Sequence, residues 1–116
     1  MSEFDLQRFT VQLLTFKARR TCMFFAVPNG EYRSKRTGAK LKAMGVRAGV
    51  ADFALTLPGG HSAYLELKSD KGRLSPEQRA FREAAEAAGA FYAVASTPEQ
   101  VQEILAGWGA LNGGAA

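Results

Sequence analysis

Two carboxylates and one ammonium interrupt segments of the chain that are otherwise apolar. Asp52 begins the segment 52–57, which reads Asp-Phe-Ala-Leu-Thr-Leu, and Glu66 and Lys68 close the segment 63–68, which reads Ala-Tyr-Leu-Glu-Leu-Lys. Ionised groups within the strands of a small core are costly unless they are paired or bind a metal. These residue types therefore indicate a site that does chemistry.

The alternation of side chains along the two segments predicts how they pair. A Pro-Gly-Gly sequence separates them, which favours a hairpin. The register that keeps apolar residues on one face sets Phe53 opposite Leu65 and Asp52 opposite Glu66, whereas a slip of one residue would mix the faces. Directly opposed residues have Cβ atoms roughly 5 Å apart, so both carboxylates can reach one cation.

The chemistry that fits this pair is metal-assisted hydrolysis of a phosphodiester. Two unpaired carboxylates at that distance repel each other, and oxygen ligands favour Mg²⁺ or Mn²⁺. Such a metal polarises a phosphoryl oxygen and lowers the pKa of a bound water. Lys68, on the same face as Glu66, could hold the attacking water or offset charge on the pentavalent phosphate. The alternative is a solvated charge pair on an exposed sheet face, which the matched Asp52 and a basic segment before it disfavour.

Residues 32–47 form that basic segment and contain no acidic residue. The formal net charge of +4 suits a nucleic-acid partner, although many basic proteins bind none. Cations in the segment and just beyond the site are candidates for phosphate contacts, the alternative being a solvated face. The candidates are Arg33, Lys35, Arg36, Lys40, Lys42, Arg47, Lys71 and Arg73.

The elements that must position these groups follow the order α-β-(α)-β-β-α-β-α, a mixed α/β domain with helices packed on a sheet. We expect helices at 3–17, 39–44, 76–88 and 98–106, and strands at 23–27, 52–57, 63–68 and 91–95. Ser75 and Gln78 form a capping box at the start of the third helix. The 116 residues suit one domain, expected over residues 1–109, with a flexible Gly/Ala-rich tail over 110–116.

Composition excludes several other classes of protein. The single cysteine, Cys22, rules out an internal disulfide, and no spacing of ligands resembles a zinc cluster. No segment has the length of a membrane span or the pattern of a signal peptide. We therefore expect an intracellular, cytoplasmic protein with no membrane partner.

Four pieces of the sequence, in order, resemble the VRR-NUC (virus-type replication-repair nuclease) family of the PD-(D/E)XK nuclease superfamily. They are residues 27–30 (Val-Pro-Asn-Gly), 45–52 (Gly-Val-Arg-Ala-Gly-Val-Ala-Asp), 66–68 (Glu-Leu-Lys) and 74–78 (Leu-Ser-Pro-Glu-Gln). Together with the helices they cover nearly the whole chain. The family usually has proline before the metal-binding aspartate, where this chain has Ala51, a difference in backbone shape rather than in chemistry.

The resemblance implies a restriction-endonuclease-like core and a Mg²⁺- or Mn²⁺-dependent endodeoxyribonuclease. It implies Asp52 and Glu66 as metal ligands, often with the Leu67 carbonyl as a third, and Lys68 as the catalytic lysine. It also points to an acid in the first helix and to a glutamine that faces the site from a later helix. Glu3 and Gln78 match these two positions, although Glu3 could serve only the helix dipole and Gln78 only the capping box.

Stand-alone members of the family resemble junction-resolving, structure-selective endonucleases that act as homodimers. The resemblance thus implies branched or duplex DNA as the substrate, with Holliday junctions among the candidates, and a role in DNA repair in a bacterium or a phage. The residues themselves leave two alternatives open. One is a non-catalytic nucleic-acid-binding module of the same fold, and the other is an accessory protein whose basic face binds an acidic partner.

Overall fold

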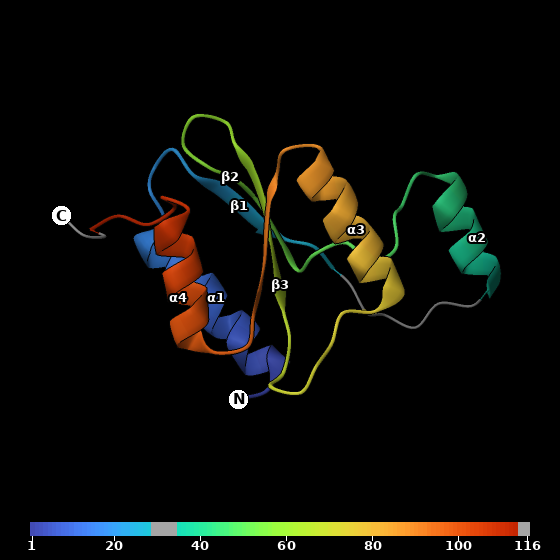
Figure 1. The fold of residues 1–116 in the computed structure, drawn as a ribbon, viewed down its shortest axis with the longest axis horizontal. Coiled ribbons are helices and arrows are strands. Elements are labelled where there is room, and N and C mark those ends of the chain that lie inside the picture. The colour runs from blue at the N-terminus through green and yellow to red at the C-terminus, as the bar shows by residue number, and fades with distance from the viewer. Residues whose placement is uncertain (29–34, 114–116) are drawn as a thin grey trace.

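The computed structural model describes residues 1–28 and 35–113, without the side chains of residues 35 and 36. The turn expected at Asn29-Gly30 and the candidate DNA contact Arg33 lie outside the described residues, as do the side chains of Lys35 and Arg36. The elements follow the predicted order (Figure 1). They are α1 (Glu3–Lys17), β1 (Met23–Ala26), α2 (Lys35–Ala43), β2 (Phe53–Thr56), β3 (Ser62–Leu67), α3 (Pro76–Ala87), β4 (Phe91–Ala95) and α4 (Pro98–Gly107).

The four strands form one mixed sheet in the order β1-β2-β3-β4. The pairs β1–β2 and β2–β3 are antiparallel, and β4 runs parallel to β3. In the β2–β3 hairpin Phe53 lies opposite Leu65, and the Leu57 N–H donates to the His61 carbonyl at 2.8 Å. The register predicted from the apolar pattern is therefore confirmed.

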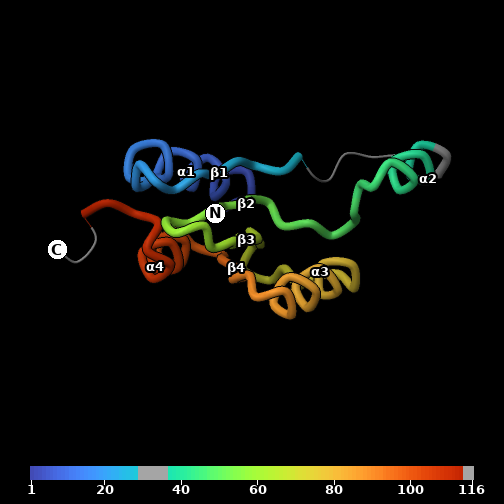
Figure 2. Tube along the Cα trace, turned by 90° about the horizontal axis from the view of Figure 1, so that it is seen from above, coloured from blue at the N-terminus to red at the C-terminus, as the bar shows by residue number. Residues whose placement is uncertain are grey.

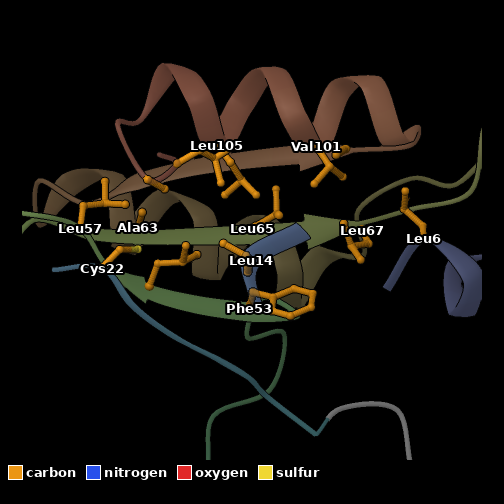
Figure 3. Packing of buried hydrophobic residues seen from close by; sticks show 14 residues of the cluster. Leu6, Leu14, Cys22, Phe53, Leu57, Ala63, Leu65, Leu67, Val101 and Leu105 are labelled. Atoms are coloured by element: carbon orange, nitrogen blue, oxygen red, sulfur yellow. The ribbon is translucent and has the colours of Figure 1, made fainter. Parts of the chain in front are cut away.

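Helices cover both faces of this sheet, as the edge-on view of Figure 1 shows. On one face α1 and α4 enclose the larger apolar cluster, whose fully buried side chains include Phe53, Leu65, Leu14 and Leu105 (Figure 3). On the other face α3 covers a smaller cluster built around Phe81. Because side chains alternate along a strand, every second residue of β2 and β3 enters the large cluster, and the residues between them face α3.

Three helices begin at capping residues that the sequence makes easy to find. Ser2, Ser75 and Thr97 each accept a hydrogen bond from a backbone N–H in the first turn of α1, α3 and α4. At α3 the capping box with Gln78 is complete, as predicted. Within the part of the chain that the structure describes, no helix is both long and apolar enough to cross a membrane.

The prediction of a flexible tail from residue 110 is wrong for the first residues of that stretch. Ala110 and Leu111 are buried in the large cluster, with 0% and 6% of their surface exposed. The Arg19 N–H donates to the Ala110 carbonyl at 2.8 Å, and the Asn112 N–H donates to the Lys17 carbonyl at 2.7 Å. The chain after α4 thus pairs with the end of α1, and the packed domain extends to at least residue 112.

The second helix, α2, stands apart from the layered body (Figure 2). It begins at Lys35, four residues earlier than predicted, and Gly45 follows its last turn with a φ of +94°, a conformation that favours glycine. The molecule is elongated as a result, with extents of 51 × 31 × 22 Å. The helix that carries much of the predicted basic segment is therefore an arm beside the domain.

Candidate active site

Asp52 and Glu66 lie side by side on the sheet face that α3 covers. Phe53 and Leu65 are opposed in the antiparallel hairpin. Asp52 precedes Phe53 and Glu66 follows Leu65, so both acids lie at the same end of the hairpin. The Leu67 N–H donates to Asp52 Oδ2 at 2.7 Å, which ties the Asp52 side chain to β3. Glu66 is buried, with only 3% of its surface exposed. The hairpin register thus brings together the two carboxylates that the sequence predicted as neighbours.

Two further side chains reach the Glu66 carboxylate. Gln78 Nε2 donates to Glu66 Oε2 at 3.3 Å, while Gln78 Oε1 accepts from the Ser75 N–H at 2.9 Å. The amide of Gln78 therefore completes the capping box and also contacts Glu66, and its role in the site stays a prediction. Lys68 Nζ lies 3.9 Å from the same Glu66 oxygen, at the long limit of an ion pair.

Glu3 lies at the rim of this site. Its Oε2 accepts a long hydrogen bond of 3.4 Å from the Ser69 N–H, which places the first turn of α1 beside the chain that leaves β3. Its charge contributes to the raised pKa of Glu66. Among the residues described here, no group of three or more His, Cys, Asp and Glu side chains is placed to hold a metal. The candidate carboxylate ligands for a metal are thus Asp52 and Glu66, and Glu3 contributes a nearby negative charge.

The Glu66 carboxyl is electrostatically frustrated. Its pKa is raised from the ordinary value of 4.5 to about 8, first by burial and then by the charge of the neighbouring Asp52 and a hydrogen bond shared with it. The Lys68 ammonium opposes this shift. A hydrogen bond between the carboxyls of Asp52 and Glu66 needs a proton on one of them. When both are ionised this bond is absent, and Glu66 Oε1 is buried without a hydrogen-bond partner.

A divalent cation fits this frustrated pair. Carboxylate oxygens are the ligands that Mg²⁺ and Mn²⁺ prefer, and a cation between Asp52 and Glu66 would satisfy the orphaned Oε1 and remove the repulsion. The Leu67 backbone lies between the two acids, with its N–H bound to Asp52. Its carbonyl as a further ligand stays a prediction from the family resemblance.

An open pocket of about 380 Å³ gives access to Asp52 from the side of the loop before β2. Gly49 lies in this loop with a φ of +79°, and a Cβ at that position would overlap the Glu77 carbonyl oxygen. The loop can therefore pass against the first turn of α3 only with glycine there. The residues that line the pocket are Ala48, Gly49, Val50, Asp52, Ser75, Glu77 and Gln78.

Gly49 belongs to the motif at residues 45–52, but the sequence alone indicates no role for it. The signal available was a glycine three residues before the candidate ligand Asp52, and its steric reason needs the position of α3.

The candidate DNA contacts that the structure describes are all exposed. Lys40 and Lys42 lie on α2, and Arg47 follows it with its guanidinium 5.7 Å above the Phe81 ring. A second pocket, of about 460 Å³, lies between α2 and the loop and shares Ala48 with the site pocket. Lys71 and Arg73 are exposed in the turn after β3. The two adjoining pockets thus lead from α2 to Asp52. The role of these cations stays a prediction.

Solved structures with this fold include two proteins described as VRR_NUC domains. One, described as "VRR_NUC domain", superposes with a TM-score of 0.64 at 17% identity, over 90% of this chain and 95% of that one. The other, a "VRR_NUC domain protein", gives a TM-score of 0.73 at 18% identity, over 93% of this chain and 88% of that one. No protein-family model and no curated protein matches the sequence.

This chain therefore has the α/β fold of the VRR_NUC domain, a restriction-endonuclease-like core, as its motifs predicted. At these identities the likeness concerns the fold, and the activity must be argued from the site.

Proposed function

We propose that this protein is a metal-dependent DNA endonuclease that hydrolyses phosphodiester bonds. The observation that carries the proposal is the pair Asp52 and Glu66, held side by side with a buried, unpartnered oxygen on Glu66 and with Lys68 3.9 Å away. Two acids and a lysine at the end of a hairpin are the groups that metal-assisted phosphodiester hydrolysis requires. The fold, shared with VRR_NUC domains, supports the same class of enzyme.

Each residue has a role that follows from its chemistry. Asp52 and Glu66 would hold Mg²⁺ or Mn²⁺ through their carboxylate oxygens; when bound, such an ion polarises a phosphoryl oxygen and lowers the pKa of a ligated water. Lys68 offsets negative charge that develops on the phosphate and orients the attacking water. Gln78 holds the Glu66 carboxylate in place from α3.

The proposed substrate is duplex or branched DNA, bound by the exposed cations of α2 and of the loop that follows it. One site cuts one strand, so symmetric cleavage of a junction would use a homodimer with two sites. Light scattering with and without DNA tests this assembly, and a monomer under both conditions would count against it. We place the activity in the cytoplasm, where such a substrate would be met.

A cleavage panel tests the proposed activity directly. Linear duplex, flap and four-way-junction DNA are incubated with the protein and Mg²⁺, Mn²⁺ or EDTA. We expect cleavage with metal, none with EDTA, and a loss of at least about 100-fold in Asp52→Asn and Lys68→Ala. Glu103→Gln and Lys17→Ala, which change exposed charges on α4 and α1, serve as controls. Salt-sensitive binding without cleavage under any metal would replace the nuclease by a non-catalytic binding module.

A further inference from the structure

A second buried polar atom lies without a partner on the same face of the sheet. Tyr92, on β4, has 8% of its surface exposed, and its hydroxyl makes no hydrogen bond. Among the residues that the structure describes, the one other such atom is Glu66 Oε1. A donor and an acceptor that both lack partners in the same buried layer indicate that they serve a common site.

The strand register places these two side chains as diagonal neighbours. In the parallel β3–β4 pair Tyr64 lies beside Tyr92, and Glu66 lies beside Val94. All four side chains face α3, because alternate residues of a strand share a face. Diagonal neighbours of this kind are about 7–8 Å apart at the backbone, a span that a tyrosine and a glutamate can bridge. The sheet thus sets the phenol within reach of the carboxylate.

The ring of Tyr92 is held so that its hydroxyl cannot turn out to water. Phe81 packs against it with ring centroids 6.1 Å apart, and the Arg82 guanidinium covers it at 5.3 Å from the centroid. Burial raises the pKa of Tyr92 to about 12, and the charge of Glu66 is the strongest charge acting on it, ahead of that of Arg82. The phenol therefore stays protonated and is available as a hydrogen-bond donor.

A purely structural tyrosine would not need this hydroxyl. The ring packs as a phenylalanine ring would, and a buried hydroxyl without a partner costs stability. Tyr64 offers the comparison: it lies on the same face and packs edge-on against Phe81 at 5.0 Å, and its hydroxyl is not among the buried atoms without a partner. Of the hydroxyls of Tyr64 and Tyr92, that of Tyr92 is the buried one without a partner.

We propose that Tyr92 is a positioning residue of the metal site, whose hydroxyl donates a hydrogen bond to the ionised Glu66 carboxylate and holds it in the orientation that binds the cation. The two groups make no such bond in the arrangement seen here, and a rotation of the carboxylate or one bridging water would be needed to join them. This role rests on the proposed metal-dependent function. The role goes beyond that function because Tyr92 lies outside the four motifs that resemble the nuclease family.

The experiment is a calorimetric Mn²⁺ titration of the metal-free wild type, of Tyr92→Phe and of the matched control Tyr64→Phe, with thermal unfolding of all three in EDTA. Loss of an outer hydrogen bond to a metal ligand weakens binding by about 10–100-fold. We expect that loss in Tyr92→Phe, with a melting temperature equal to or above that of the wild type, and wild-type Mn²⁺ affinity in Tyr64→Phe.

The outcomes separate this role from the proposed function. A folded Tyr92→Phe that binds Mn²⁺ within about twofold of the wild type overturns the role of Tyr92 and leaves the nuclease proposal standing. Mn²⁺ binding by the wild type without cleavage of any DNA overturns the nuclease and leaves the role of Tyr92 in metal binding. A wild type that binds no Mn²⁺ overturns both.

Discussion

Gln78 links the first turn of α3 to Glu66 through the two ends of one amide. Its Oε1 accepts from the Ser75 N–H at 2.9 Å and its Nε2 donates to Glu66 Oε2 at 3.3 Å. The capping bond fixes which end of the amide faces the site, since the oxygen is used at the cap. The helix start and the orientation of the Glu66 carboxylate are therefore set by the same side chain.

Replacing Gln78 by glutamate separates these two roles. Glutamate also completes a capping box, but it would turn an acceptor, not a donor, toward Glu66. We expect Gln78→Glu to fold normally and to lose about 10–100-fold in metal affinity and cleavage rate, because outer-shell donors orient metal ligands. Calorimetry and the cleavage assay measure both quantities.

Gln100 provides a matched control for that substitution. It stands at the equivalent position of α4, where its Oε1 accepts from the Ser96 N–H at 2.7 Å and its N–H donates to Thr97 Oγ1 at 3.1 Å. Gln100→Glu should leave cleavage unchanged. Equal losses in both variants would mean that helix capping, rather than the donor to Glu66, underlies the effect.

The stability of the metal-free protein should fall as pH rises from about 4.5 to about 8. Burial and the Asp52 charge raise the pKa of Glu66 from 4.5 to about 8, so between these values the folded state binds a proton that the unfolded state has released. The contribution is fully present below 4.5 and is lost as pH passes through 8, with a slope of at most about 1.4 kcal/mol per pH unit. Urea unfolding in EDTA across this range measures the slope.

The isosteric variant Glu66→Gln should remove most of that slope, because an amide does not titrate. Glu83→Gln, which changes an exposed acid on α3, should keep it. A wild-type free energy of unfolding that stays flat from pH 4.5 to 8 would show that Glu66 is ionised throughout and that its buried oxygen is solvated. Added Mn²⁺ should stabilise the wild type most at the upper end of the range, where Glu66 is ionised.

The fold and the heart of the site could be predicted because local rules decide them. The period of two in the hairpin segments allows one register, and that register alone brings Asp52 beside Glu66. The Ser-Pro-Glu-Gln and Thr-Pro-Glu-Gln sequences mark the starts of α3 and α4 by the chemistry of capping. These features depend on neighbours in sequence, which a single sequence displays.

The features that escaped prediction depend on contacts between distant segments. Composition favours fraying at Ala110 and Leu111, but the end of α1 provides a backbone partner for that stretch. In the sequence Gly49 is indistinguishable from other loop glycines. Its steric role depends on Glu77 of α3, 28 residues later, whose backbone lies against it. The sequence indicates only that Tyr92 is a core aromatic of a strand. Its position diagonal to Glu66 follows from the parallel pairing of β3 with β4. A single sequence shows none of these tertiary contacts.

Substitution of Gly49 by alanine should displace the loop that carries Asp52. The positive φ alone costs about 1–2 kcal/mol for alanine, and the added Cβ would overlap the Glu77 carbonyl, which adds about 1–3 kcal/mol of overpacking. Gly59→Ala is the control, since Gly59 has a φ of +89° with no atom within 4 Å of an added Cβ. Urea unfolding should show the larger loss in Gly49→Ala, and equal losses would mean that the loop moves aside at no cost.

The cations of the arm should bind phosphates without choosing a sequence. In an Asp52→Asn background, which keeps DNA intact, we expect Lys40→Ala/Lys42→Ala/Arg47→Ala to lower DNA affinity and to reduce the slope of log K against log salt by about 2–3, because each lost phosphate contact contributes about 0.9. Fluorescence anisotropy at several salt concentrations measures the slope.

The control for the arm is a second set of three exposed cations, changed together as Lys17→Ala/Arg19→Ala/Arg20→Ala at the end of α1. Both sets remove three positive charges, so a general effect of net charge would lower affinity equally in the two variants. A decrease in slope confined to the arm variant would place the DNA along α2 and the adjoining pockets that lead to Asp52. An unchanged slope in the arm variant would move the DNA path to another face, with Lys71 and Arg73 beside the site as the next cations to test.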